Sequence, residues 1–113
     1  MQNSGYNIKA LQMYREQYPD KIHVASFDTA FHSSQSKLSK SFALPKKFFE
    51  EGVYKYGFHG LSYQSITQSI RNLCKENFPK KIIVAHLGNG ASMCAIENGI
   101  SIASKWVLLP LKG

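Results

Sequence analysis

A glycine-rich turn between two β-like runs is the feature of this chain best suited to chemistry. In the stretch V-A-H-L-G-N-G-A-S, residues 84–92, two glycines flank one asparagine. Glycine accepts positive φ and has no Cβ, so the backbone N–H groups of such a turn can approach an anion closely. His86 and Asn89 add side-chain donors beside them. The stretch is therefore interpreted as a phosphate cradle, and the alternative is an ordinary hairpin turn.

Two other residues stand at positions where ligands often bind. Asp28 follows an expected strand over 21–27, and ligands collect beyond the carboxyl ends of strands in open α/β sheets. The alternative is that Asp28 caps the following turn. His59 directly precedes an expected helix, whose unpaired N–H groups attract anions. A purely structural histidine is the alternative there.

The elements that must position these residues follow from the spacing of apolar side chains. A helix is expected over 7–18, with Asn7 as its N-cap and Pro19 as its stop. A polar loop is expected over 32–47. A second helix is expected over 61–77, with Ser62 as a possible cap of its first turn. Its expected buried stripe consists of Ile66, Ile70, Leu73 and Cys74.

Three strands are expected after this helix, over 80–86, 91–97 and 100–104. The dipeptide Asn98-Gly99 separates the last two and is a strong hairpin signal. Helix, strand, loop, helix and three strands together indicate an α/β or α+β protein with a mixed sheet.

The composition limits the classes of protein to which the chain can belong. With 113 residues, 43% of them apolar, it has material for one modest domain. The net charge of +7 comes from scattered residues, which indicates a solvated surface or a general attraction for anions, without an RNA-binding signature. Cys74 and Cys94 lack zinc-ligand spacing. No signal peptide or membrane span is recognised, so we expect a cytoplasmic protein without nucleic-acid or membrane partners.

Three phrases taken together carry a specific resemblance. They are F-D-T-A-F-H at 27–32, Y-G-F-H-G at 56–60 and H-L-G-N-G-A-S at 86–92. In this order and at these separations the chain resembles the acetokinase family of the actin-like ATPase and sugar-kinase superfamily, from about residue 7 to residue 101. The resemblance implies an α/β, ribonuclease-H-like (actin-like) mixed sheet with flanking helices and an incomplete two-domain fold. Residues 1–30 would end the first domain and residues 31–113 would begin the second, or the chain would form one compact unit.

The resemblance also implies roles for individual residues. Asp28 matches the family's active-site acid, and His59 matches a histidine that stabilises the transition state. Phe58 and Pro110 match walls of the acyl pocket. The loop that holds the phosphates of ATP is matched by His86, Leu87, Gly88, Asn89 and Gly90. The implied reaction is ATP + acetate = acetyl phosphate + ADP with Mg²⁺, whose ligands lie largely outside this chain, so no metal ligand is assigned here.

The chain also departs from the family pattern. Family segments that carry a first phosphate loop, two arginines and the adenosine-binding loops are absent. Asn3 and Tyr63 stand where the family has histidines. The family's closing pattern S-x-D-T-S-M-G-x-T-P-L-E-G is altered at Ala103, Trp106, Val107 and Lys112.

These departures leave several functions open. We expect a carboxylate kinase segment that is inactive or weak alone, and that forms a homo-oligomer or associates with the missing segments. One alternative is a non-catalytic nucleotide- or anion-binding remnant. Another is a fragment of a propionate or butyrate kinase.

Overall fold

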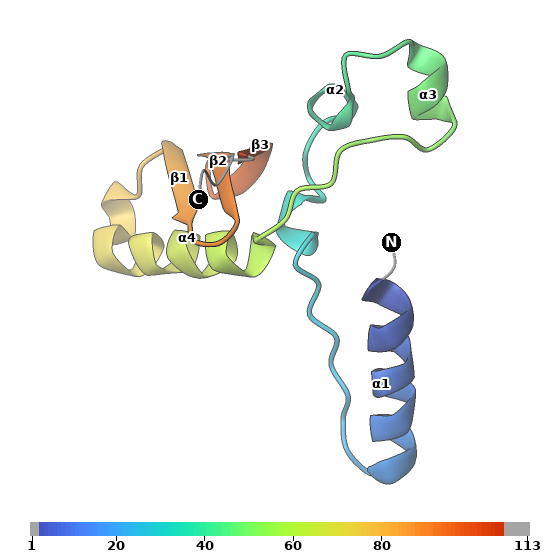
Figure 1. The fold of residues 1–113 in the computed structure, drawn as a ribbon. Coiled ribbons are helices and arrows are strands. Elements are labelled where there is room, and N and C mark those ends of the chain that lie inside the picture. The colour runs from blue at the N-terminus through green and yellow to red at the C-terminus, as the bar shows by residue number, and fades with distance from the viewer. Residues whose placement is uncertain (1–2, 108–113) are drawn as a thin grey trace.

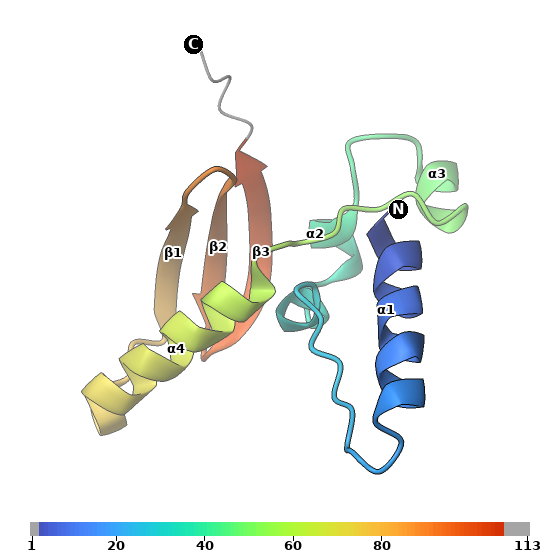
Figure 2. The same ribbon diagram turned by 60° about the horizontal axis from the view of Figure 1, so that its bottom comes forward.

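The computed structural model describes residues 3–107 of the chain (Figure 1). In chain order the elements are α1 (Asn3–Gln17), η1 (Ala30–His32), α2 (Lys37–Lys40), α3 (Lys46–Glu50), α4 (Gly60–Cys74), η2 (Lys75–Asn77), β1 (Lys81–Leu87), β2 (Ala91–Glu97) and β3 (Ile100–Val107). Helix α4 lies across one face of the three strands, whereas α1 projects away from them (Figures 1 and 2). In the described part of the chain no helix is long and apolar enough to cross a bilayer.

The sheet is an antiparallel meander in the order β1-β2-β3. Asn98 and Gly99 turn between β2 and β3 with φ of 53° and 83°, as a type I′ hairpin requires. Strand β3 extends three residues beyond its expected end at residue 104. The predicted α/β class is confirmed, but all strand pairs among residues 3–107 are antiparallel, so the described sheet shows no parallel part.

The core lies between α4 and the sheet. Tyr63, Cys94 and Ile96 are fully buried there, with Ile82 and Val84 of β1 packed against them. The predicted buried stripe of α4 is partly wrong, because Leu73 is 82% exposed and Ile66 is also exposed. The buried line instead starts at Tyr63 and Thr67 and continues through the half-buried Ile70 and Cys74. Thr67 can face the core because its hydroxyl donates to the carbonyl of Tyr63, at 2.7 Å.

The N-terminal part of the chain is helical and extended without a core of its own. Helix α1 is confirmed, but it begins at Asn3, so Asn7 lies inside the helix and is not its N-cap. The strand expected over 21–27 is not formed, since this segment is extended without a ladder partner among the described residues. Ile22 is 93% exposed. A strand is stable only when a neighbour takes its backbone hydrogen bonds, and the radius of gyration of 17.2 Å exceeds the ~13 Å of a compact domain of this length.

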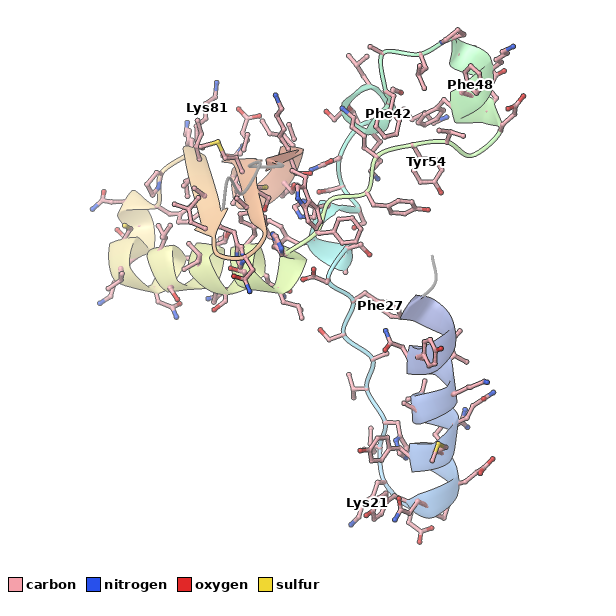
Figure 3. All side chains as sticks on the ribbon, in the orientation of Figure 1. Lys21, Phe27, Phe42, Phe48, Tyr54 and Lys81 are labelled. Atoms are coloured by element: carbon pink, nitrogen blue, oxygen red, sulfur yellow. The ribbon has the colours of Figure 1, made fainter. Side chains whose placement is uncertain are left out.

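The segment expected to be a loop over 32–47 contains the short helix α2, and α3 begins at its end, at Lys46. Ser36 caps α2 by accepting a hydrogen bond from the amide of Ser39. Figure 3 shows Phe42, Phe48 and Tyr54 on the segment 40–55, which contains α3. A backbone hydrogen bond of 2.7 Å, from the amide of Lys55 to the carbonyl of Lys40, joins the two ends of this segment. The chain then continues to Phe58 and His59.

Candidate functional site

The carboxylate of Asp28 caps the first turn of α4. Its Oδ2 accepts a hydrogen bond from the amide of His59 at 2.7 Å, and its Oδ1 accepts one from the amide of Leu61 at 3.3 Å. The backbone carbonyl of Asp28 accepts the amide of Gly60, also at 2.7 Å. Asp28 therefore does act as a cap, but of a helix 31 residues further along the chain and not of the adjacent turn. A carboxylate at a helix N-terminus is favoured by the helix dipole.

His59 is held at the start of α4 in a left-handed conformation, with φ of 58°. Such a φ is strained for a residue with a Cβ, and the paired backbone amides of His59 and Gly60 hold it. The imidazole Nδ1 lies 2.8 Å from the hydroxyl of Ser92 on β2. The edge that carries Nε2 faces the glycine turn, since a Cβ built on Gly90 would lie 3.3 Å from this nitrogen.

The ring of His86, at the end of β1, stacks on the ring of His59. Their centroids are 4.0 Å apart and their planes are inclined by 19°. His86 Nδ1 lies 3.0 Å from the hydroxyl of Ser62, so Ser62 binds this histidine and the side-chain cap of α4 is supplied by Asp28. The structure thus brings together Asp28, His59 and His86, which are distant in sequence.

The glycine turn at 88–90 uses its glycines differently from the prediction. Neither Gly88 nor Gly90 has positive φ, so the expected left-handed turn is wrong. Gly90 is needed because a larger residue would press on the His59 ring. A Cβ on Gly88 would meet nothing closer than 3.8 Å, which leaves the backbone of the turn open to approach. Leu87 and Asn89 are exposed beside it.

A hollow of about 670 Å³ opens next to this cluster, within the size range of small-molecule sites. Phe58 and Trp106 meet edge to face at 5.2 Å on its wall. Ser92, Lys55 and Lys105 also line the hollow, so it combines apolar walls with polar residues. Pro110, the other expected pocket wall, lies outside the described residues.

A buried hydrogen-bond network around His32 supports the residues of the site. His32 binds the hydroxyl of Ser101 through Nδ1 at 2.9 Å and donates from Nε2 to the carbonyl of Phe58 at 3.0 Å. Burial lowers the pKa of the His32 imidazole, although the Phe58 carbonyl and the charge of Asp28 raise it. Gln35 joins the network by donating to Ser101 at 2.9 Å. The network thereby fixes the backbone that carries Phe58 and His59.

Both cysteines are free thiols in the structure. Burial raises the pKa of the Cys94 thiol, which makes it less reactive. Residues 3–107 contain no cluster of three His, Cys, Asp or Glu side chains suited to bind a metal ion.

The sequence interpretation missed three side chains that contact the central histidine or its partners. Ser92 binds His59, Tyr63 binds Ser92, and Trp106 lies 5.4 Å from the His59 ring, centroid to centroid. The helical spacing of His59 and Tyr63 was a usable signal, because residues four apart share a helix face. The pairing of His86 with Ser92 in the strand register was not readable from local pattern.

Comparison with known proteins identifies the family. The family model described as "Acetokinase family" matches residues 2–113. The chain belongs to the acetokinase family. It is 43% identical over 108 residues to acetate kinase of Rickettsia akari, covering 96% of this chain and 28% of that protein. It is 47% identical over 108 residues to acetate kinase of Methylocella silvestris, covering 96% of this chain and 27% of that protein.

Solved structures of acetokinase relatives share the fold. The crystal structure of Porphyromonas gingivalis acetate kinase aligns with a TM-score of 0.80 at 33% identity, over 95% of this chain and 27% of that chain. A propionate kinase from Francisella tularensis aligns with a TM-score of 0.77 at 33% identity, over 94% of this chain and 28% of that one. The predicted incomplete actin-like fold is thereby confirmed. The chain spans little more than a quarter of the length of these relatives.

Proposed function

We propose that this chain contributes the phosphoryl-transfer wall of a carboxylate kinase site, for the reaction ATP + acetate = acetyl phosphate + ADP. The observation that carries the proposal is the placement of His59. Asp28 holds its backbone, Ser92 holds Nδ1, and its Nε2 edge faces the open turn at Gly88–Gly90. Phosphoryl transfer needs donors around the charged γ-phosphoryl group and little covalent help from the protein.

The glycine turn is the proposed seat of the ATP phosphates. Backbone amides of residues 87–90 and the side chains of His86 and Asn89 would donate to phosphate oxygens, as they do in other glycine-rich phosphate loops. The open space around Gly88 admits such a close approach.

The hollow beside Phe58 and Trp106 is the proposed place of the carboxylate substrate. Its apolar wall suits a short acyl chain, and Lys55, which also lines the hollow, would attract the carboxylate group. An acetate oxygen would attack the γ-phosphorus, the bond from this phosphorus to the bridging oxygen would break, and ADP would leave. The likeness to a propionate kinase supports short-chain carboxylates as the substrate class.

Mg²⁺ would accompany ATP and share the charge of its phosphates. Both oxygens of Asp28 already accept backbone amides, and the described residues form no three-ligand cluster. We therefore expect the ion to be held through phosphate oxygens, water and ligands outside this chain, and assign no step to a metal ligand in it.

Alone, the chain is expected to be inactive or weak. Loss of one electrostatic donor from such a site costs ~10²-fold or more in rate, and this chain spans 28% of a curated relative. The exposed apolar face of the sheet, with Ile83 76% and Leu87 78% exposed, supports association with further segments or a second copy. The two free cysteines fit a reducing compartment, in agreement with our proposal of a cytoplasmic location.

Nucleotide binding to the full chain tests the proposal. Trp106 is the single tryptophan and lies beside His59, so its fluorescence should change when ATP is titrated in. His86→Phe keeps the stacked ring but removes its donor, and should weaken ATP binding about tenfold or more, because a hydrogen bond to a charged group is worth ~1.5–3 kcal/mol. His23→Phe, in the exposed segment before Asp28, is the matched control and should leave binding unchanged.

Hydroxamate formation from acetate, ATP, Mg²⁺ and hydroxylamine then separates the alternatives. Product above background would establish a kinase. ATP binding without product would agree both with the nucleotide-binding remnant and with a kinase segment that is inactive alone. Absence of ATP binding in the folded chain, or equal binding by the His86→Phe variant, would contradict the proposed phosphate site.

A further inference from the structure

Three side chains form a hydrogen-bonded chain behind the catalytic edge of His59. The phenol of Tyr63 bonds to the hydroxyl of Ser92, and this hydroxyl lies 2.8 Å from Nδ1 of His59. Tyr63 is fully buried and Ser92 nearly so. Water therefore has little access to the first two members of the chain, and each of their protons must be donated within it.

Counting protons gives the chain a direction. Among the described residues, Ser92 is the one side-chain partner of the Tyr63 hydroxyl. A backbone hydrogen bond with His86 also lowers the pKa of Tyr63, and a backbone group that lowers this pKa is an N–H donor, so it cannot receive the phenol proton. Tyr63 must therefore donate to Ser92. If Ser92 donated back to Tyr63, the buried phenol proton would have no acceptor, at a cost of about 1–3 kcal/mol. Ser92 is then left with one proton to give and one acceptor to receive it, which is Nδ1 of His59.

The geometry points to Ser92 as the residue that fixes the tautomer of His59, with the imidazole proton on Nε2, and to Tyr63 as the residue that fixes the direction of the Ser92 hydroxyl. Both are positioning residues, because Ser92 acts through His59 and Tyr63 acts through Ser92. The alternative tautomer, with the proton on Nδ1, would leave the proton of Ser92 or of Tyr63 buried without an acceptor.

Two further observations support this assignment. Burial raises the pKa of the Tyr63 phenol, although its hydrogen bond with Ser92 lowers it, so Tyr63 keeps its proton at neutral pH. The Nε2 edge of His59 faces Gly90, where a proton on Nε2 can serve as a donor. The use of this donor toward a phosphoryl oxygen rests on the proposed function, whereas the tautomer itself does not.

The test is long-range ¹H–¹⁵N NMR of the four histidine rings in the full chain, without nucleotide, at about pH 9, where an ordinary imidazole is neutral. We expect His59 to show one protonated nitrogen, Nε2. Ser92→Ala should shift the ratio of Nε2–H to Nδ1–H forms by at least about fivefold toward Nδ1–H, because the penalty for an unsatisfied hydroxyl disappears. Ser92→Thr keeps a hydroxyl and should retain the original ratio.

Two other variants serve as controls. Ser62→Ala removes the equivalent hydroxyl from His86 and should change the signals of His86 while leaving the tautomer of His59 unchanged. Tyr63→Phe removes the phenol proton but leaves Ser92 no other acceptor than Nδ1, so His59 should keep Nε2–H in this variant too.

The inference would be overturned by a proton on Nδ1 of His59 in the unmodified chain, or by an unaltered tautomer ratio in Ser92→Ala. Should Ser92→Ala fail to fold, the unmodified chain and Tyr63→Phe still decide the matter. Since no nucleotide is present, a failure here is distinct from the failure of ATP binding that would refute the proposed function.

Discussion

The two parts of the chain, residues 3–27 and 28–107, each contain a long helix but differ in what packs against it. Helix α4 presses Tyr63 against β2, where Cys94 and Ile96 are also buried. Helix α1 carries apolar residues at helical spacing as well, yet Tyr14 is 59% exposed and no side chain of residues 5–27 is buried. Apolar residues at helical spacing predicted a helix in both parts of the chain. A core forms only in the second part, where the sheet provides a surface against which the helix packs.

This difference predicts where stability resides. The α4–sheet unit combines apolar burial with satisfied polar networks around His32 and His59. The first part adds a stacked Tyr14–Tyr18 pair and a hydrogen bond from His23 to the Tyr18 carbonyl, both at the surface. Changes of the same type in the two parts should therefore have unequal effects, measured on the full chain.

The largest contrast is expected between two tyrosines. Tyr63→Ala should lower the free energy of unfolding by about 4 kcal/mol, because it leaves a cavity in the core. Tyr14→Ala should cost less than about 1 kcal/mol. Urea unfolding followed by Trp106 fluorescence measures both. Equal unfolding midpoints for the two variants would show that the α4–sheet interface is not the core of the chain.

A second contrast concerns two glycines, one in each helix. A Cβ on Gly60 would lie 2.1 Å from the carbonyl oxygen of Asp28, whereas a Cβ on Gly5 would meet nothing within 4 Å. Gly60→Ala should therefore destabilise the unit by about 3 kcal/mol through overpacking against backbone.

Gly5→Ala should instead raise the helix content of α1, because alanine is favoured over glycine in a helix by about 1 kcal/mol. Circular dichroism measures the helix content, and the unfolding midpoint of Trp106 measures the unit. A loss of stability in Gly5→Ala as large as in Gly60→Ala would contradict the difference between the two parts.

The smallest effect is expected from pH. Burial lowers the pKa of His32 below its ordinary value of 6.5, so the native state holds fewer protons than the unfolded state below this pH. The contribution of neutral His32 to the free energy of unfolding is therefore complete above about pH 6.5. It is lost as the pH falls from 6.5 toward the lower pKa that His32 has in the native state. Unfolding midpoints measured from neutral to mildly acidic pH should show this decline.

Two variants sharpen the pH test. His32→Gln should remove this part of the pH dependence, at a cost in overall stability. His23→Gln, in the exposed extended segment, should keep the decline of the unmodified chain. If His32→Gln retained the full decline, another group would have to be responsible for it.

Much of the local structure was predictable from the sequence. The two long helices, the three C-terminal strands and the Asn98-Gly99 turn are each predicted by residues that lie only a few positions apart in the sequence. The three phrases around Asp28, His59 and His86 pointed to one site, and the fold brings these residues together. Their catalytic and binding roles, and the division at residues 30 and 31, stay predictions.

The errors concern choices between partners that are distant in sequence. Ile66 and Leu73 fit the helical period as well as Tyr63 and Thr67 do, and only the sheet decides which side is buried. The segment 21–27 has the composition of a strand, but no described strand pairs with it. Asp28 was weighed as a cap of its own turn, while its hydrogen bonds go to the start of α4.

The sequence by itself determined which segments become helices, strands and turns, because hydrogen bonds within a helix and the conformational limits of Asn and Gly act over a few residues. The tertiary structure alone decided that Ser92 and Tyr63 stand behind His59, and that its ring lies close against Gly90. Those contacts depend on the strand register and on the angle at which α4 crosses the sheet. Both are set by packing over the whole unit, which no local pattern encodes.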